Sequence, residues 1–305
     1  MNVANITKTL LLREWMQHKR GWLILAAVPF VVILLGITFG NVRVGEDEGE
    51  ALVATPLAAM LGAAALASTL ALMWLAVLLQ APGLARRDVQ DRSIEFWLSL
   101  PTPAWLSVAV TLLAHLLLAP WFAIVCGLVG AALLAPLVVV KAFGFSALAD
   151  VPWTQLAGTG LAMGLRIAIG LALATLWASP LILGAMAASA WLKRWGVPAL
   201  AGLLAIGGGL ERAVFGTQGI HQSVGYLGQQ AGLALVGASG QNAAQAMPKI
   251  EGPNELARVL PHAVNWIFGD LAAALQRLAT PGFAAALAIG AARVLLLVIR
   301  RQRGG

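Results

Sequence analysis

The chain has 305 residues, of which 60% are hydrophobic and 11% charged, and its formal net charge is +7. Soluble domains carry about 25% charged and 45–50% apolar residues, so this composition excludes an ordinary soluble domain and predicts a membrane protein. The basic residues sit at the ends of apolar runs rather than in one patch, which argues against nucleic-acid binding. The single cysteine, Cys126, lies inside an apolar run and excludes an intramolecular disulfide or a cysteine metal cluster.

Residues 1–20 are predicted to contain an interfacial helix that leads into the first span. Leu11 and Trp15 fall on an apolar arc of this helix, whereas Glu14 and Arg20 fall on the opposite, polar arc. We expect Trp15 to anchor the helix at the membrane surface.

Six apolar runs are long enough to cross a bilayer, which takes about 20 apolar residues. They cover residues 21–40, 55–84, 106–140, 157–191, 197–215 and 283–298. The fifth run is the weakest, because Glu211 and Arg212 shorten its apolar core. We therefore expect an all-α membrane protein with six transmembrane helices, forming a single transmembrane domain over residues 1–305.

Residues 217–280 are predicted to form an outer subdomain between the fifth and sixth spans. This stretch is rich in Gly and Gln at first and then weakly helical over residues 255–278, with a break at Pro261. A seventh span over residues 226–237 would be too short, so we reject it.

The most distinctive segment lies between the second and third spans, and residues 86–100 within it are predicted to form an amphipathic helix that ends at Pro101. Its polar face carries Asp88, Asp91, Arg92 and Glu95, and its apolar face carries Val89, Phe96, Trp97 and Leu100. We expect Phe96, Trp97 and Leu100 to anchor the helix in lipid. The charged face would then be offered to a soluble partner.

Three ionisable side chains fall within the predicted spans, namely His115, Arg166 and Arg293. Charges inside a membrane are expensive, so these residues are candidates for lining a transport pathway. Alternatively, Arg293 extends toward the basic end of its span and Arg166 toward the outer interface. For His115 a core or cavity position is favoured over a proton relay, because no acidic residue shares a span with it.

The sequence contains no Gly-x-x-x-x-Gly-Lys-Ser/Thr loop, no His-Glu-x-x-His motif and no close His/Cys/Asp cluster. We therefore expect this chain to bind no cofactor or metal and not to be an enzyme. Gly237-Ala-Ser-Gly240, with His262 downstream, superficially resembles the rhomboid protease signature. Polar residues follow the serine where an apolar helix should begin, so a small-residue loop is favoured.

The segment Arg86-Arg-Asp-Val-Gln-Asp-Arg-Ser-Ile-Glu-Phe-Trp-Leu-Ser-Leu-Pro101 resembles the first cytoplasmic loop of type-2 ATP-binding-cassette (ABC) permeases, in the version of a bacterial export subgroup. The matching elements are Asp91-Arg92, Ser93, Ile94-Glu95 and Leu98-Ser-Leu-Pro101. Thr102-Pro-Ala-Trp105 departs from the basic residues often found after this proline.

The resemblance implies the permease subunit of a bacterial ABC exporter in the inner membrane. Two copies of a cytosolic ATPase would bind ATP and Mg, and a second permease copy, expected to be identical, would complete a dimer embedded in lipid. The segment 86–100 would be the coupling helix, docking through Arg86, Arg87, Asp88, Asp91, Arg92 and Glu95. The alternatives are a non-exporting ABC subunit that drives a periplasmic machine, or a membrane immunity or scaffold protein.

The distribution of Lys and Arg predicts that both termini and residues 86–103 face the cytoplasm, because 12 of the 20 basic residues then lie in cytoplasmic segments. In a Cys126→Ser background, Gln90→Cys should resist an impermeant maleimide in intact cells, whereas Asp47→Cys in the first outer loop should react. Labelling at position 90 in intact cells would contradict this topology.

Overall fold

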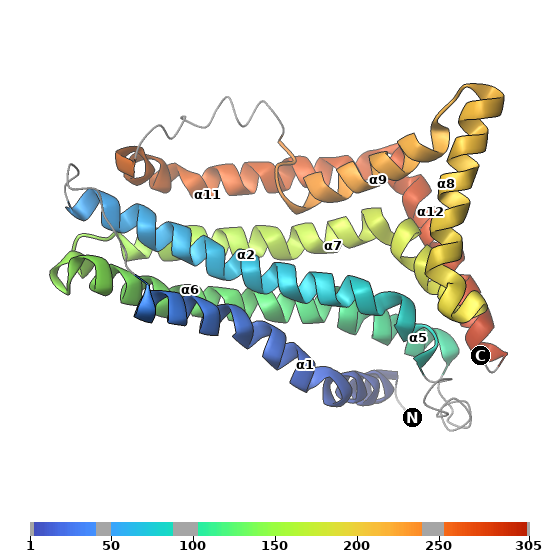
Figure 1. The fold of residues 1–305 in the computed structure, drawn as a ribbon, viewed down its shortest axis with the longest axis horizontal. Helices are drawn as coiled ribbons and strands as arrows, with labels where there is room; N and C mark the ends of the chain where they lie inside the picture. Colours follow the sequence, from blue (N-terminus) through green and yellow to red (C-terminus); the bar gives the residue numbers. More distant parts are fainter. Residues whose placement is uncertain (1–2, 41–49, 88–102, 240–252, 304–305) are drawn as a thin grey trace.

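The computed structural model describes residues 3–40, 50–87, 103–239 and 253–303, and the regular secondary structure in these ranges is entirely helical (Figure 1). In chain order the helices are α1 (Val3–Phe39), α2 (Glu50–Leu84), α5 (Ala104–Leu113), η1 (Ala114–Leu118), α6 (Ala119–Phe143), η2 (Ser146–Leu148), α7 (Trp153–Leu192), η3 (Lys193–Trp195), α8 (Gly196–Phe215), α9 (Gly219–Leu235), α11 (Pro253–Gln276), η4 (Arg277–Ala279) and α12 (Pro281–Gln302).

Five helical stretches among the described residues are long and apolar enough to cross a membrane. The longest runs from Trp153 to Phe215, and the left-handed backbone of Lys193 (φ 53°) divides it into α7 and α8. The expectation of an all-α, multi-pass membrane protein is therefore confirmed at the level of fold class. The division into six spans remains a prediction.

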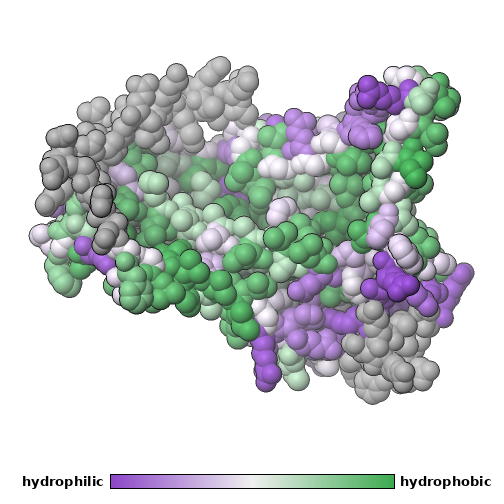
Figure 2. Space-filling model, in the orientation of Figure 1, coloured by the Kyte–Doolittle hydropathy of each residue, from purple (hydrophilic) through white to green (hydrophobic). Residues whose placement is uncertain are grey.

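Helix α7 lies at the centre of the packing, because it contacts α2, α6, α8, α9, α11 and α12. Helices α2 and α6 run side by side (Figure 1), and at Gly127 they approach so closely that a Cβ atom would lie 2.8 Å from the Cα of Leu66. Small residues permit such contacts between helices in membranes. Figure 2 shows a broad apolar face over α1, α2 and α6, with hydrophilic side chains gathered toward the end where both termini lie.

The N-terminal segment that was predicted to form an interfacial helix leading into the first span is continuous with that span. Helix α1 runs from Val3 to Phe39 without interruption, so residues 3–20 and the first span share one helix. No glycine or proline occurs between residues 5 and 20 to stop the helix, and Pro29 is tolerated further along.

The region 217–280 differs from expectation in its secondary structure. Its Gly- and Gln-rich start forms α9, and α11 passes through Pro261 without ending. Both helices pack along α7 instead of forming a body of their own. Burial of Leu260, Ile267 and Leu271 on α11 explains why the helix persists, since packing outweighs the local cost of proline.

An ion pair and several hydrogen bonds of Arg166, together called the Arg166 tie, join α9 and α11 to α7. The guanidinium of Arg166 donates to Asp270 Oδ2 on α11 (3.0 Å from Nε, 2.7 Å from Nη2) and to the carbonyl oxygens of Ala234 and Leu235 (2.8 and 3.1 Å). Partial burial disfavours the ionised form of Asp270. Hydrogen bonds from Ser239 and from Arg166 outweigh that effect and lower the pKa of Asp270 below its ordinary value.

Asp270→Asn should destabilise the packing of α9 and α11, because it leaves the buried Arg166 without its counter-charge. Breaking a buried pair in this way typically costs about 3–5 kcal/mol. The measurement is the thermal unfolding midpoint of the purified protein in detergent, with Asp150→Asn at an exposed site as the matched control. Equal midpoints for the two variants would contradict a stabilising role for this pair.

Candidate functional site

The carboxylate of Glu14 is the most constrained charge at the end of the bundle that holds both termini. Its side chain is 1% exposed, although the sequence pattern placed it on the polar arc of the N-terminal helix. Oε1 accepts hydrogen bonds from Arg13 Nη2 (2.6 Å), Arg87 Nη2 (2.8 Å) and Thr111 Oγ1 (3.0 Å), and Oε2 accepts one from Arg87 Nη1 (2.9 Å). Burial of this charge is possible because two guanidinium groups compensate it.

The partners of Glu14 connect three parts of the chain that are distant in sequence. Arg87 follows the end of α2 and is separated from Glu14 by 73 positions, whereas Thr111 lies in α5 and is separated by 97. The segment 88–102 lies between these two partners. Glu14 therefore fastens α1 to the chain on both sides of that segment.

Two histidines stand beside the carboxylate. His18 follows Glu14 by one helical turn on α1, and its Nδ1 lies 3.9 Å from Glu14 Oε2. His115 reaches the same oxygen from η1, again with its Nδ1 at 3.9 Å. Trp22 closes the group on the next turn of α1, with ring centroids 5.8 Å from His18 and 5.6 Å from His115.

The position of His115 depends on a local change of helix type. Residues 114–118 form a π-helical turn between α5 and α6, and Pro120 lies two residues after its end. Proline has no N–H to donate within the helix, which favours a rearranged hydrogen-bond ladder at this point. π-Helical turns inside α-helices often occur at functional sites.

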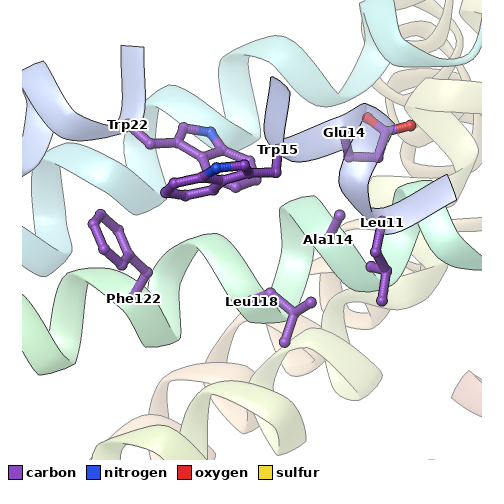
Figure 3. A pocket seen from close by; sticks show the side chains of 7 residues that line it. All are labelled: Leu11, Glu14, Trp15, Trp22, Ala114, Leu118 and Phe122. Carbon is purple, nitrogen blue, oxygen red and sulfur yellow. The ribbon is translucent and has the colours of Figure 1, made fainter. Parts of the chain in front are cut away.

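A cavity of about 260 Å³ adjoins this group, between α1 and the helix that contains η1. It is lined by Leu11, Glu14, Trp15, Trp22, Ala114, Leu118 and Phe122. Figure 3 shows the aromatic rings grouped at one end and Glu14 at the other. Apart from Glu14 the lining is apolar, so the cavity could hold a hydrophobic group. It could also restrict access to the neighbouring histidines.

Most residues predicted to dock the ATPase lie outside the described part of the chain, namely Asp88, Asp91, Arg92 and Glu95. The same holds for the predicted lipid anchors Phe96, Trp97 and Leu100. Arg86 and Arg87 are described, and the side chain of Arg87 is 15% exposed and turned toward Glu14. Docking through Arg87 would require this pair to separate. Trp15, the other predicted anchor, is 38% exposed and packs against Trp22 and Phe122.

The three ionisable residues predicted within the spans occupy different places. His115 is fully buried and has the acidic neighbour that the sequence analysis did not find, because Glu14 lies outside the predicted spans. Arg166 is 1% exposed and is held inside the bundle by Asp270. Arg293 is half-buried on α12, with its guanidinium against Gly184 of α7.

The predicted small-residue loop Gly237-Ala-Ser-Gly240 is described as far as Ser239, and this serine has a structural role. The Ser239 hydroxyl donates to Asp270 Oδ1 at 2.7 Å, and its backbone N–H donates to the same oxygen at 2.7 Å. The serine thus helps to hold Asp270 in place.

The sequence matches no protein-family model, no curated protein and no solved structure. The case for a function therefore rests on the residues of this chain and on their geometry. Sequence reasoning missed Glu14 as the centre of the site. The available signal was the spacing Glu14-x-x-x-His18-x-x-x-Trp22, which puts all three side chains on one face of a helix.

Glu14→Gln should weaken the attachment of Arg87 and lower the thermal stability, because two buried guanidinium groups lose their counter-charge. The expected loss is about 3–5 kcal/mol. Trypsin cleavage at the Arg86–Arg87 pair in inside-out vesicles should become faster. Glu211→Gln removes an exposed carboxylate that caps α9 and serves as the matched control. Unchanged cleavage and stability in Glu14→Gln would contradict the role assigned to Glu14.

Proposed function

We propose that this chain is the permease subunit of a bacterial ABC exporter of the type-2 family. A separate cytosolic ATPase binds and hydrolyses ATP, and this chain converts the resulting movement into opening of a path across or out of the membrane. In the complete complex, two ATPase subunits would act on two copies of this permease in the inner membrane, with the termini of each copy in the cytoplasm.

The observation that supports this proposal best is the attachment of Glu14 on both sides of the segment 88–102. The ATPase would push on the coupling helix, residues 86–100, through Asp88, Asp91, Arg92 and Glu95. Arg87 immediately precedes this polar face, and Thr111 follows it in α5. Because both residues bind Glu14, a displacement of the coupling helix would be passed to α1.

The apolar surface of the helices is consistent with a permease surrounded by lipid and by a second copy. Leu203, Ile206, Leu210 and Val214 on α8 are exposed, and so are Leu295 and Leu296 on α12. Exposed apolar side chains of this kind are normal where they meet lipid tails. They are also available to pack against the dimer partner.

A second candidate is a non-exporting ABC subunit that drives a periplasmic machine. The length of the helices favours it: α7 has 40 residues, which corresponds to about 60 Å of helix, whereas the hydrocarbon core is about 30 Å thick. Such helices extend beyond the membrane and could transmit movement to a protein outside it. In that case the complex would hydrolyse ATP without transporting a solute.

Reversing the predicted docking charges should uncouple ATP hydrolysis from transport while leaving the chain inserted. Glu95→Lys, or Asp91→Arg combined with Arg92→Asp, places like charges against the ATPase, and such contacts can cost several kcal/mol. Exposed charges contribute little to folding, about 0–1 kcal/mol per pair. The measurements are membrane level, ATPase co-purification and transport-coupled hydrolysis.

Trp97→Ala is the matched comparison, because it should loosen the lipid anchor of the helix without reversing any docking charge. The unmodified chain should co-purify with an ATP-binding subunit and, once freed of it, should show only background ATP hydrolysis. Normal coupling in all charge reversals, or the lack of any ATP-binding subunit in the native complex, would contradict the proposed function.

A further inference from the structure

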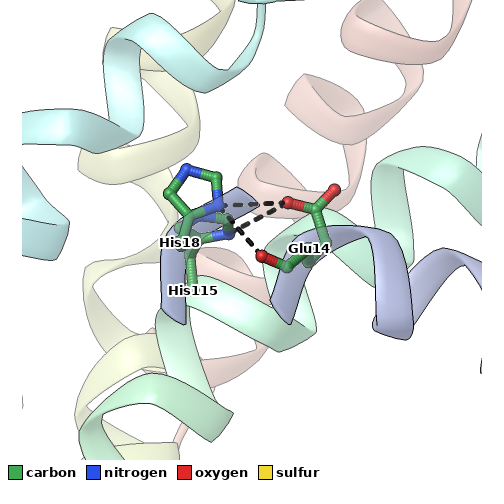
Figure 4. A group of neighbouring side chains, drawn as sticks. All are labelled: Glu14, His18 and His115. Atoms are coloured by element: carbon green, nitrogen blue, oxygen red, sulfur yellow. Dashed lines mark hydrogen bonds and ion pairs between the residues drawn. The ribbon is translucent and has the colours of Figure 1, made fainter. Parts of the chain in front are cut away.

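Three potential metal ligands converge between α1 and η1. They are Glu14 and His18 from α1 and His115 from η1, and one donor atom of each lies within 4.8 Å of the other two (Figure 4). No metal site was expected from the sequence, which contains no close His/Cys/Asp cluster, and His115 lies about a hundred positions from the other two residues. The fold brings these side chains together.

The chemistry of the three donors suits a divalent transition metal. Two imidazoles and one glutamate form a common zinc ligand set, with bond lengths of about 2.0–2.2 Å and a further position open to water. In a tetrahedral site the donor atoms are then about 3.4 Å apart. Each Nδ1 lies 3.9 Å from Glu14 Oε2, and all three donor atoms lie within 4.8 Å of one another, so the three side chains must move closer together to hold a metal.

Surrounding hydrogen bonds orient the ligands. Arg13 and Thr111 hold Oε1 of Glu14, which turns Oε2 toward the two histidines. The Nδ1 atoms lie 3.1 Å from carbonyl oxygens of their own helices, those of Glu14 and Thr111, so each ring is already fixed. Metal binding through Nδ1 places the ring proton on Nε2 and replaces each contact with a carbonyl oxygen, so the metal competes with these contacts.

The three ligands differ in their exposure. His115 is fully buried, and its Nε2 has no hydrogen-bond partner among the described residues. The cavity lined by Glu14, Trp15 and Trp22 borders the site, and the side chain of His18 is 20% exposed. His18 is therefore the most accessible of the three ligands.

The charges around the site determine how a metal can enter. Arg87 Nη1 donates to Oε2 at 2.9 Å, which is the oxygen that would coordinate the metal. Arg13 lies on the other oxygen, at 2.6 Å. A divalent cation next to both guanidinium groups is repelled, and it gains Oε2 only when Arg87 moves away. The ion and Arg87 thus exclude each other at this atom.

We propose that Glu14, His18 and His115 form a binding site for a divalent transition metal ion of the zinc class, and that the metal competes with Arg87 for Glu14. Occupancy would displace Arg87 Nη1 from Oε2. Metal binding by the isolated chain does not depend on an ATPase partner, so it can be tested independently of the proposed transport function.

The experiment is titration of the purified full-length chain, carrying a tag without histidines, with Zn²⁺ by calorimetry and with Co²⁺ by visible absorption. We expect one ion per chain and a cobalt spectrum typical of nitrogen and oxygen ligands. His18→Ala and His115→Ala should each weaken binding by at least about tenfold. Arg87→Ala should strengthen it, because the competing cation is gone.

His262→Ala is the matched control, since His262 is an exposed histidine on α11 outside the cluster, and its affinity should equal that of the unmodified chain. Thermal unfolding midpoints identify any variant that has lost its fold. His18→Ala keeps the test decisive if the buried His115→Ala unfolds. The proposal is overturned if the unmodified chain binds no zinc, if His18→Ala binds it equally well, or if Arg87→Ala weakens binding.

Discussion

A buried carboxylate must be compensated wherever the chain places it, and that requirement at Glu14 organises the end of the molecule that holds both termini. An ion removed from water costs several kcal/mol unless charged partners and hydrogen bonds surround it. Arg87 and Arg13 provide the charge and Thr111 provides a further hydrogen bond. Because these groups come from three separate parts of the chain, compensating one charge also fixes how α1, the end of α2 and α5 pack together.

The same principle applies to Arg166, where the buried charge is positive. Here a buried guanidinium requires Asp270 and two carbonyl oxygens at the end of α9, and satisfying it attaches α9 and α11 to α7. Helices in a membrane gain little from the hydrophobic effect when they associate, so polar ties and close contacts at small residues such as Gly127 carry more of the specificity. One group of polar contacts, around Glu14, lies near the termini, and the other, around Arg166, joins α9 and α11 to α7.

The polar contacts of Glu14 can rearrange more easily than those of Arg166 and Asp270. Asp270 also accepts hydrogen bonds from Gly237 and Ser239, so its partners are spread over a loop and a helix and would all have to move together. Oε2 of Glu14, by contrast, is contacted by Arg87 and faces two histidines, with which the proposed metal ion could take the place of Arg87. A carboxylate with alternative cationic partners can exist in two arrangements, which is what a mechanical or ligand-controlled element requires.

The sequence by itself determined the class of the protein and the positions of its long helices, because these follow from the local density of apolar residues and from their interruption by charged, glycine and proline residues. It did not determine that α11 continues through Pro261, since that depends on packing against other helices. It also could not show that Glu14 is buried, because its partners stand 73 and 97 positions away. Only the tertiary structure decided which charges meet, since pairing is fixed by distance in space and a local pattern contains no such distance.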